Sequence, residues 1–337
     1  MSNVMKKLEG TNKLLFAIPL KPVQGHRFQP TGFPSLGAAT FQTKEGMGLL
    51  VESPQSMANR LEAACWDEAS AELLPALKGL SYIRVERTGK DGKRSYFTSS
   101  ITEAHRLNSP YLLEGKDKSF FNELKEALGG LESGPIDRRA LAQTLLKYDV
   151  NCLLHGIFLA KKELAGGRLR IARAISAFIE ADEVKQAISG GVKNDHVNPS
   201  GSTKEGFGNV PFSREEFTAG RITLYVNIDL GQIRGFGLGQ DVEELLVVLA
   251  LFKLRALVDG SLRLRTACDL EVAVETVETA RPVGFVLPDL AELEVAVKSA
   301  IEACKDRMKV TTVEFNDELK KGSDKEESEK GEDEGSN

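Results

Sequence analysis

Hydrophobic and polar positions alternate in some segments of the chain and recur at helical spacing in others, which predicts a mixture of strands and helices. Strand-like patterns cover residues 12–23, 48–52, 82–88, 95–100, 152–160, 222–230 and 270–277. Helical patterns begin at Pro54 and Asp137 and cover residues 120–128, 241–259 and 288–308. Because these elements do not alternate regularly, we predict an α+β sheet domain with excursions rather than repeated strand–helix units.

The segment SPQSMANRLE, residues 53–62, directly follows the strand-like run 48–52. Ser53 is a favourable N-cap and Pro54 suits the first helical position. Gln55, Ser56 and Asn59 then lie in the first turns, with Arg60 on the flank. The unpaired N–H groups of a helix N-terminus attract anions, so one interpretation is a phosphate cradle. An ordinary capped amphipathic helix is the alternative interpretation.

Residues 190–212 are rich in Gly, Asn, Ser and Pro and lack periodicity. Loops of this length are usually functional or disordered. We therefore expect one elaborated domain over residues 1–313, with insertions at about residues 82–135 and 190–220.

Net charge is distributed unevenly between the predicted domain and the C-terminal residues. The whole chain has a net charge of −5, whereas residues 314–337 contain ten acidic and four basic residues, a net of −6. Residues 1–313 are therefore close to neutral, and their basic residues must be judged by clustering. The composition of residues 314–337 predicts an acidic disordered tail.

The four cysteines, Cys65, Cys152, Cys268 and Cys304, are far apart and lie in apolar contexts. This pattern predicts small core residues and neither a disulfide framework nor a zinc site. The longest apolar run, residues 245–252, is too short to cross a bilayer. The expected location is the reducing cytoplasm, without membrane contact.

Catalytic motifs are weak in this sequence. The glycines Gly235, Gly237 and Gly239 lack the third fingerprint glycine of a dinucleotide site, because Gln240 stands in its place. The histidines show no metal-ligand spacing, and His155, inside an apolar run, is expected to be a satisfied core residue. We therefore expect no catalytic residues, no metal and no cofactor.

Small groups of cations lie beside flexible glycine-containing backbone and aromatic residues. Arg138 and Arg139 open a predicted helix, and Arg168, Arg170 and Arg173 follow a pair of glycines. Such combinations suit single-stranded nucleic acid, although a solvated surface is the better explanation of any one group taken alone.

Several motifs together resemble one protein family. They are KPVQGHRFQPTGFP (residues 21–34), VESPQSMANRLE (51–62), EAHRLNSP (103–110), GRLR (167–170) and RGFGLG (234–239). They resemble the backbone subunit of type I-G (formerly I-U) CRISPR effector complexes, a divergent member of the Cas-seven group in the RAMP superfamily. The likeness extends from about residue 12 to 280.

The resemblance implies an RRM-like (ferredoxin-like) antiparallel-sheet palm with large inserted finger and thumb elements. It implies a protein that binds CRISPR guide RNA, contacts further copies of itself head to tail in a filament, and joins other effector subunits. Target DNA would be met indirectly, through pairing with the guide, in antiviral defence. Asn59-Arg60 stands where more distant backbone subunits carry a basic pair, so one expected cation is missing.

We expect the RNA contacts to come from these motifs and cation groups. The predicted RNA-binding residues are Lys21, Gln24, His26, Arg27, Gln29, Ser53, Gln55, Ser56, Asn59, Arg60, His105, Arg106, Asn108, Arg168, Arg170, Arg173, Arg234, Gly235 and Gly237. The alternative function is a RAMP-type endoribonuclease that processes CRISPR repeat RNA, with His26 or His105 as general acid or base.

Overall fold

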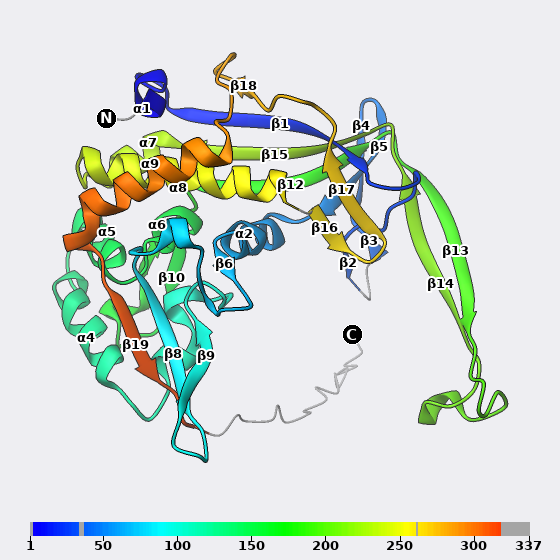
Figure 1. Cartoon of the computed structure of the whole chain (residues 1–337), viewed down its shortest axis with the longest axis horizontal. Helices are drawn as coiled ribbons and strands as arrows, with labels where there is room; N and C mark the ends of the chain where they lie inside the picture. Colours follow the sequence, from blue (N-terminus) through cyan, green and yellow to red (C-terminus); the bar gives the residue numbers. More distant parts are fainter. Residues whose placement is uncertain (1–2, 34–36, 261, 318–337) are drawn as a thin grey trace, which may run out of the picture.

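A long antiparallel sheet forms the centre of the molecule, which is a computed structural model that describes residues 3–33, 37–260 and 262–317 (Figure 1). The order across the sheet is β16 (Leu262–Arg265), β17 (Cys268–Val272), β1 (Lys13–Pro22), β15 (Arg221–Asp229), β12 (Ile175–Asp182), β5 (Gly46–Glu52) and β4 (Thr40–Thr43). A further strand, β18 (Thr279–Arg281), also pairs with β1. Helices and strands are thus mixed around an antiparallel sheet, which confirms the α+β prediction at this level.

Alternating apolar residues fix the register of the central strands. In β1, Leu14 and Phe16 are buried and lie opposite Ile228 and Val226 of β15. On the other side of β15, Ile175 of β12 lies opposite the same Ile228. A slip of one residue would turn these side chains to the opposite face, so the pattern specifies one pairing.

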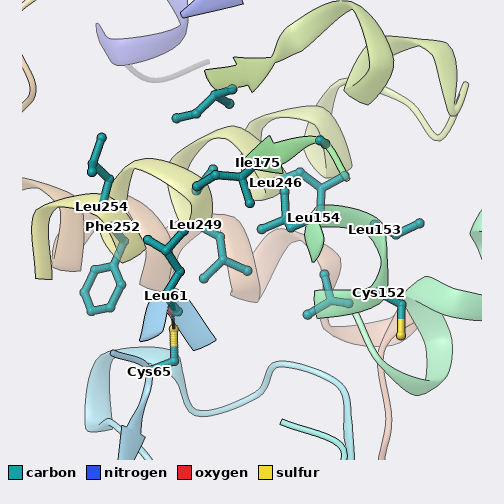
Figure 2. Packing of buried hydrophobic residues seen from close by; sticks show 14 of the residues in the cluster. Leu61, Cys65, Cys152, Leu153, Leu154, Ile175, Leu246, Leu249, Phe252 and Leu254 are labelled. Atoms are coloured by element: carbon teal, nitrogen blue, oxygen red, sulfur yellow. Dashed lines mark hydrogen bonds between the residues drawn. The ribbon is translucent and has the colours of Figure 1, made fainter. Parts of the chain in front are cut away.

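Helices cover one face of this sheet. The long α8 (Gln240–Asp259) packs beside α9 (Leu290–Cys304), and α2 (Pro54–Ala63) contacts both α8 and β12. Figure 2 shows Leu61 of α2 and Leu249 of α8 within one apolar cluster, near Ile175 of β12. The short α1 (Asn3–Lys7) and α7 (Leu230–Gly235) lie near one end of β1 and β15 (Figure 1).

A smaller lobe is built from residues 82–148 and the C-terminal segment. Its sheet contains β19 (Val310–Glu314), β8 (Tyr82–Thr88) and β9 (Arg94–Ser99), and its helices are α3 (Pro110–Leu113), α4 (Ser119–Leu128) and α5 (Arg138–Tyr148). Strand β19 is parallel to β8, and the ring of Phe315 stacks on Phe97 at 5.8 Å between centroids. Residues 314–317 therefore belong to the folded body. The rest of the predicted tail, residues 318–337, lies outside the described residues.

Short paired strands complete the chain. They are β2 (Gly32–Phe33) with β3 (Gly37–Ala38), β6 (Trp66–Asp67) with β7 (Glu72–Leu73), and β10 (Ile157–Leu159) with β11 (Leu169–Ile171).

The prediction of a structureless loop at 190–212 is wrong. Strands β13 (Lys185–Lys193) and β14 (Val210–Thr218) form a continuous antiparallel hairpin that projects from the body (Figure 1). Only residues 194–209 lie between the two strands. Gly190 and Gly191 carry no side chains, so the alternation that identifies a strand is interrupted there.

The prediction of a buried strand over 152–160 is also wrong. Residues 151–155 form α6 (Asn151–His155), which ends at Gly156, and only Ile157–Leu159 is a strand. Continuous apolar runs do not distinguish a buried strand from a buried helical turn.

The four cysteines are buried and free, as expected of core residues. Within the described residues, no helix is long and apolar enough to cross a membrane.

Candidate nucleic-acid interface

The local structure predicted for α2 is confirmed. Ser53 has extended backbone angles (φ −77°, ψ 158°), and its Oγ accepts a hydrogen bond from the Ser56 backbone N–H at 3.2 Å. Pro54 occupies the first turn. Ser53 is therefore engaged in capping the helix, and Gln55 is the first exposed polar side chain beyond the cap.

An open cavity of about 1040 Å³ lies beside the start of α2, and we call it the central groove. It is lined by Gln55, Arg106, Arg138, His155, Gly156, Ile157, Phe158, Arg170, Ile171, Ala172, Arg173, Asp229, Gly231, Gln232, Gly235 and Phe236. The fold thus brings together five of the predicted RNA-binding residues, namely Gln55, Arg106, Arg170, Arg173 and Gly235.

Three cations of the groove differ in their partners. Arg138 and Arg170 are exposed, and neither side chain has a hydrogen bond or ion pair to a described residue. Arg173 is half-buried; its Nη2 donates to Gln55 Oε1 and its Nη1 to the Pro54 carbonyl oxygen at 3.4 Å. Burial, and then the nearby Arg106, lower the pKa of Arg173. The groove therefore presents positive charge to solvent.

Arg106 is the exception among the predicted contacts. It is 6% exposed, and its Nε and Nη2 donate to the two carboxylate oxygens of Glu62 at 2.7 and 2.6 Å. Burial raises the pKa of Glu62, although Arg106 opposes that rise. Its guanidinium is thus committed to a buried carboxylate, and its contact with RNA stays a prediction.

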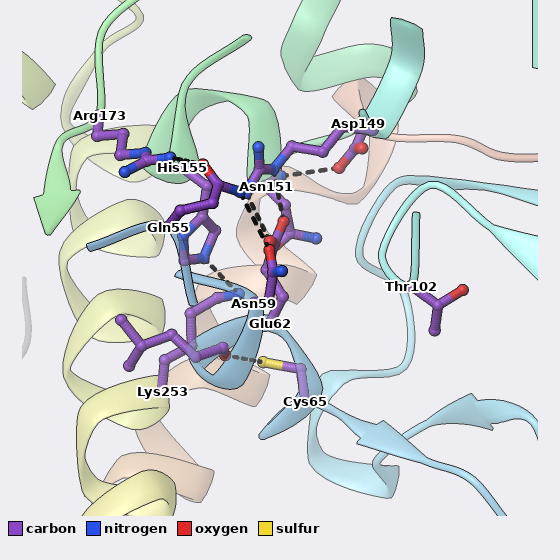
Figure 3. A network of polar contacts seen from close by, with 12 residues as sticks. Gln55, Asn59, Glu62, Cys65, Thr102, Asp149, Asn151, His155, Arg173 and Lys253 are labelled. Atoms are coloured by element: carbon purple, nitrogen blue, oxygen red, sulfur yellow. Dashed lines mark hydrogen bonds and ion pairs between the residues drawn. The ribbon is translucent and has the colours of Figure 1, made fainter. Parts of the chain in front are cut away.

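Further polar groups lie below the groove with this pair (Figure 3). Asp149 is fully buried, and its Oδ1 accepts from the Asn151 backbone N–H at 3.0 Å at the start of α6. Lys253 of α8 is fully buried, with Nζ 3.1 Å from Nε2 of His155. His155 is a core residue as predicted, but its Nδ1 has no partner among the described residues.

A second group of predicted residues lies along the loop after β1. Gln24, His26 and Arg27 are exposed and line a separate cavity of about 510 Å³. Arg27 pairs with Glu216 at 3.2 Å, and Lys21 with Glu271 at 3.1 Å.

Gln29 borders a third cavity, of about 380 Å³. Its carbonyl oxygen accepts from Arg265 Nη1 at 2.8 Å. The motif that follows β1 is therefore divided between two cavities, and neither of them is the central groove.

Three predicted cations have protein partners outside the groove. Arg60 donates to the Leu264 carbonyl oxygen at 2.8 Å, and Arg168 donates to the Leu131 carbonyl oxygen, also at 2.8 Å. Arg234 pairs with Glu243 at 3.1 Å. These guanidinium groups connect elements of the fold, and their contact with RNA stays a prediction.

The remaining predicted residues lie on other parts of the surface. His105 and Gly237 are exposed, and Asn59 accepts from Gln55 Nε2 at 3.4 Å. Asn108 is partly buried. His26 and His105 line no common cavity among those described. The described residues also contain no cluster of ligands for a metal ion.

Sequence reasoning missed several members of the groove, Phe158 and Gln232 among them. Phe158 is 55% exposed although it stands in an apolar run. In β10 it lies between the buried Ile157 and Leu159, and because all three residues are apolar, no pattern in the sequence identifies it as exposed.

The structure thus combines an antiparallel α+β sheet with a groove lined by four arginines. The chain belongs to the CRISPR-associated protein GSU0053 family, whose model matches residues 14–186, about half of the chain. No curated protein matches. Among solved structures, a chain of a "CRISPR RNA-guided surveillance complex, pre-nicking" aligns at 14% identity and a TM-score of 0.37, covering 77% of this chain and 75% of that one.

Proposed function

We propose that the chain is a noncatalytic, guide-RNA-binding backbone subunit of a type I-G CRISPR effector complex. Family membership supports a role in CRISPR defence. The observation that carries the RNA-binding part is the central groove, where Arg138 and Arg170 have no partner among the described residues and Arg173 lines the same cavity. Unpaired guanidinium groups along an open groove suit a phosphate backbone, which is recognised by charge and shape rather than by sequence.

In this proposal the antiparallel sheet is the RRM-like palm, and the hairpin β13–β14 is an inserted thumb or finger. Repeated copies contact one another head to tail, which gives an open filament rather than a closed ring. Specificity for target DNA comes from base pairing with the guide, so the protein does not have to read the sequence.

The test is to coexpress the full chain with a transcript that contains CRISPR repeats and spacers, purify the chain and sequence the bound RNA. We expect RNA of defined length that contains spacer sequence. Absence of RNA, or random fragments only, would contradict the proposal. Cleavage of repeat RNA by the chain alone would favour the endoribonuclease instead.

A matched pair of variants connects this test to the groove. The double substitution Arg138→Glu/Arg170→Glu should abolish copurification of RNA, because it reverses two unpaired charges of the groove. Lys298→Glu, at an exposed position of α9 outside the groove, should leave the RNA yield unchanged.

A further inference from the structure

His155 holds a fixed position at the floor of the central groove. It is the last residue of α6 and 1% exposed, and it lines the groove beside Gly156 and Arg173. Gly156 has φ 76° and ψ 162°, a region that essentially only glycine adopts. A Cβ there would lie 2.8 Å from the Ile171 carbonyl oxygen. The backbone therefore holds the imidazole against the segment that carries Arg173.

Lys253 determines which nitrogen of His155 carries the proton. Its ammonium group can only donate, and its Nζ lies 3.1 Å from His155 Nε2. With Lys253 as the donor, Nε2 accepts, and the proton of the neutral ring lies on Nδ1. Burial, reinforced by Lys253 and then Arg106, lowers the pKa of His155 well below its usual value, so the ring is neutral.

The resulting Nδ1–H group is a donor without an acceptor. Nδ1 is buried and has no partner among the described residues. Buried polar groups without a partner are rare in native structures because the missing bond is costly. Gln55, Arg173 and His155 are drawn together in Figure 3, and all three residues line the groove.

We propose that His155 is an RNA-positioning residue whose Nδ1–H donates to a phosphate oxygen of the strand in the central groove. The phosphate first takes the Arg173 guanidinium from the neutral amide of Gln55, which uncovers the imidazole. A guanidinium binds a phosphate more strongly than it binds an amide oxygen, so the exchange is favourable. This inference rests on the proposed function, since it names how the same groove holds RNA.

Phosphate fits the groove better than another acceptor does. Arg138, Arg170 and Arg173 line the same cavity, and all three guanidinium groups are suited to bidentate contacts with phosphate. A neutral N–H donor among them adds a directional bond without adding charge. His155 should thus affect affinity but not the dependence of affinity on salt.

Two substitutions test the roles of the two ring nitrogens of His155 separately. His155→Gln places an amide oxygen near the Nε2 position, where it accepts from Lys253, and removes the donor at Nδ1. His155→Asn places an amide N–H near the Nδ1 position and leaves Lys253 without its acceptor. The binding probe is a fluorescein-labelled single-stranded RNA of about 20 nucleotides, titrated with the full chain at several salt concentrations.

For His155→Gln we expect RNA binding about tenfold weaker than that of the wild type, which is the value of one hydrogen bond to a charged group. The slope of log Kd against log salt should not change. His155→Asn should bind RNA more tightly than His155→Gln while unfolding at lower urea. Wild-type affinity in a folded His155→Gln variant would overturn the proposal and leave His155 a core residue only.

Imidazole ¹⁵N spectra of the wild-type chain give an answer that does not depend on any variant. The free protein should show the proton of His155 on Nδ1, and saturation with RNA should shift the Nδ1 resonance. An unchanged resonance in the RNA complex would overturn the inference. Failure of the wild-type chain to bind RNA would instead contradict the proposed function, so the two failures are distinguishable.

Discussion

At the scale of single residues, the buried pair of Glu62 and Arg106 dominates the region below the groove. Both side chains are at least nine-tenths buried and make two parallel hydrogen bonds. Desolvation of two charges is expensive, so such a pair adds less to stability than its geometry suggests. Removing only one of the two charges lowers stability strongly, because the remaining charge then stays buried without its partner.

Glu62→Gln should therefore lower the free energy of unfolding by about 3–5 kcal/mol. Urea denaturation of the full chain measures the effect. The control is Glu302→Gln, which removes an exposed carboxylate paired with Lys305 and should cost less than about 1 kcal/mol. Equal effects at the two positions would show that the buried pair has no special role.

At the scale of elements, the turn between α6 and β10 determines how the groove is built. Gly156 ends α6 and turns the chain into β10, next to Ile171–Arg173. This turn places His155 and Phe158, which are three residues apart, on the floor and the wall of one cavity. The backbone conformation of a single glycine therefore connects the packing of α6 with the shape of the groove.

Gly156→Ala should destabilise the chain by about 1–3 kcal/mol beyond Gly166→Ala. Both glycines have positive φ, 76° and 75°, but a Cβ at Gly156 meets backbone at 2.8 Å, whereas the space around Gly166 is open. Thermal unfolding of the two variants provides the comparison. If Gly166→Ala destabilises the chain more than Gly156→Ala does, the close backbone contact at Gly156 does not determine the loss of stability.

Several elements could be predicted from the sequence because local rules determine them. The alternation in β1 and the Ser53–Pro54 cap of α2 needed no knowledge of distant residues. The run 152–160 could not be assigned, since α6 and β10 are both buried and only the turn at Gly156 separates them. Arg170 and Gln55 were both predicted to bind RNA, but it was not predicted that they line the same cavity. Sequence spacing carries no information on tertiary distance.

Burial of predicted site residues was the least predictable feature. Arg106 and His105 are neighbours in one polar motif, yet Arg106 is buried against Glu62 and His105 is exposed. The carboxylate that removes Arg106 from the surface lies 44 positions away in the chain. No local pattern in the sequence contains that information.

At the scale of the whole molecule, any attraction of nucleic acid must come from local groups of cations rather than from the net charge. The net charge of the chain is −5, so the overall field does not attract nucleic acid. Under the proposed function, affinity for RNA then depends on Arg138 and Arg170, the cations of the central groove without a partner among the described residues. Binding by such a groove depends on salt in proportion to the number of phosphates it neutralises.

The most direct measurement of the central claim is the salt dependence of RNA binding by the wild type and by Arg138→Ala/Arg170→Ala. For single strands each lost phosphate contact lowers the slope of log Kd against log salt by about 0.7. If the central groove binds RNA, the slope should be smaller by about 1.4 for the double variant, because two contacts are lost. The slope should stay unchanged for Lys298→Ala. Equal slopes for the wild type and the double variant would contradict the assignment of the groove as the RNA-binding site.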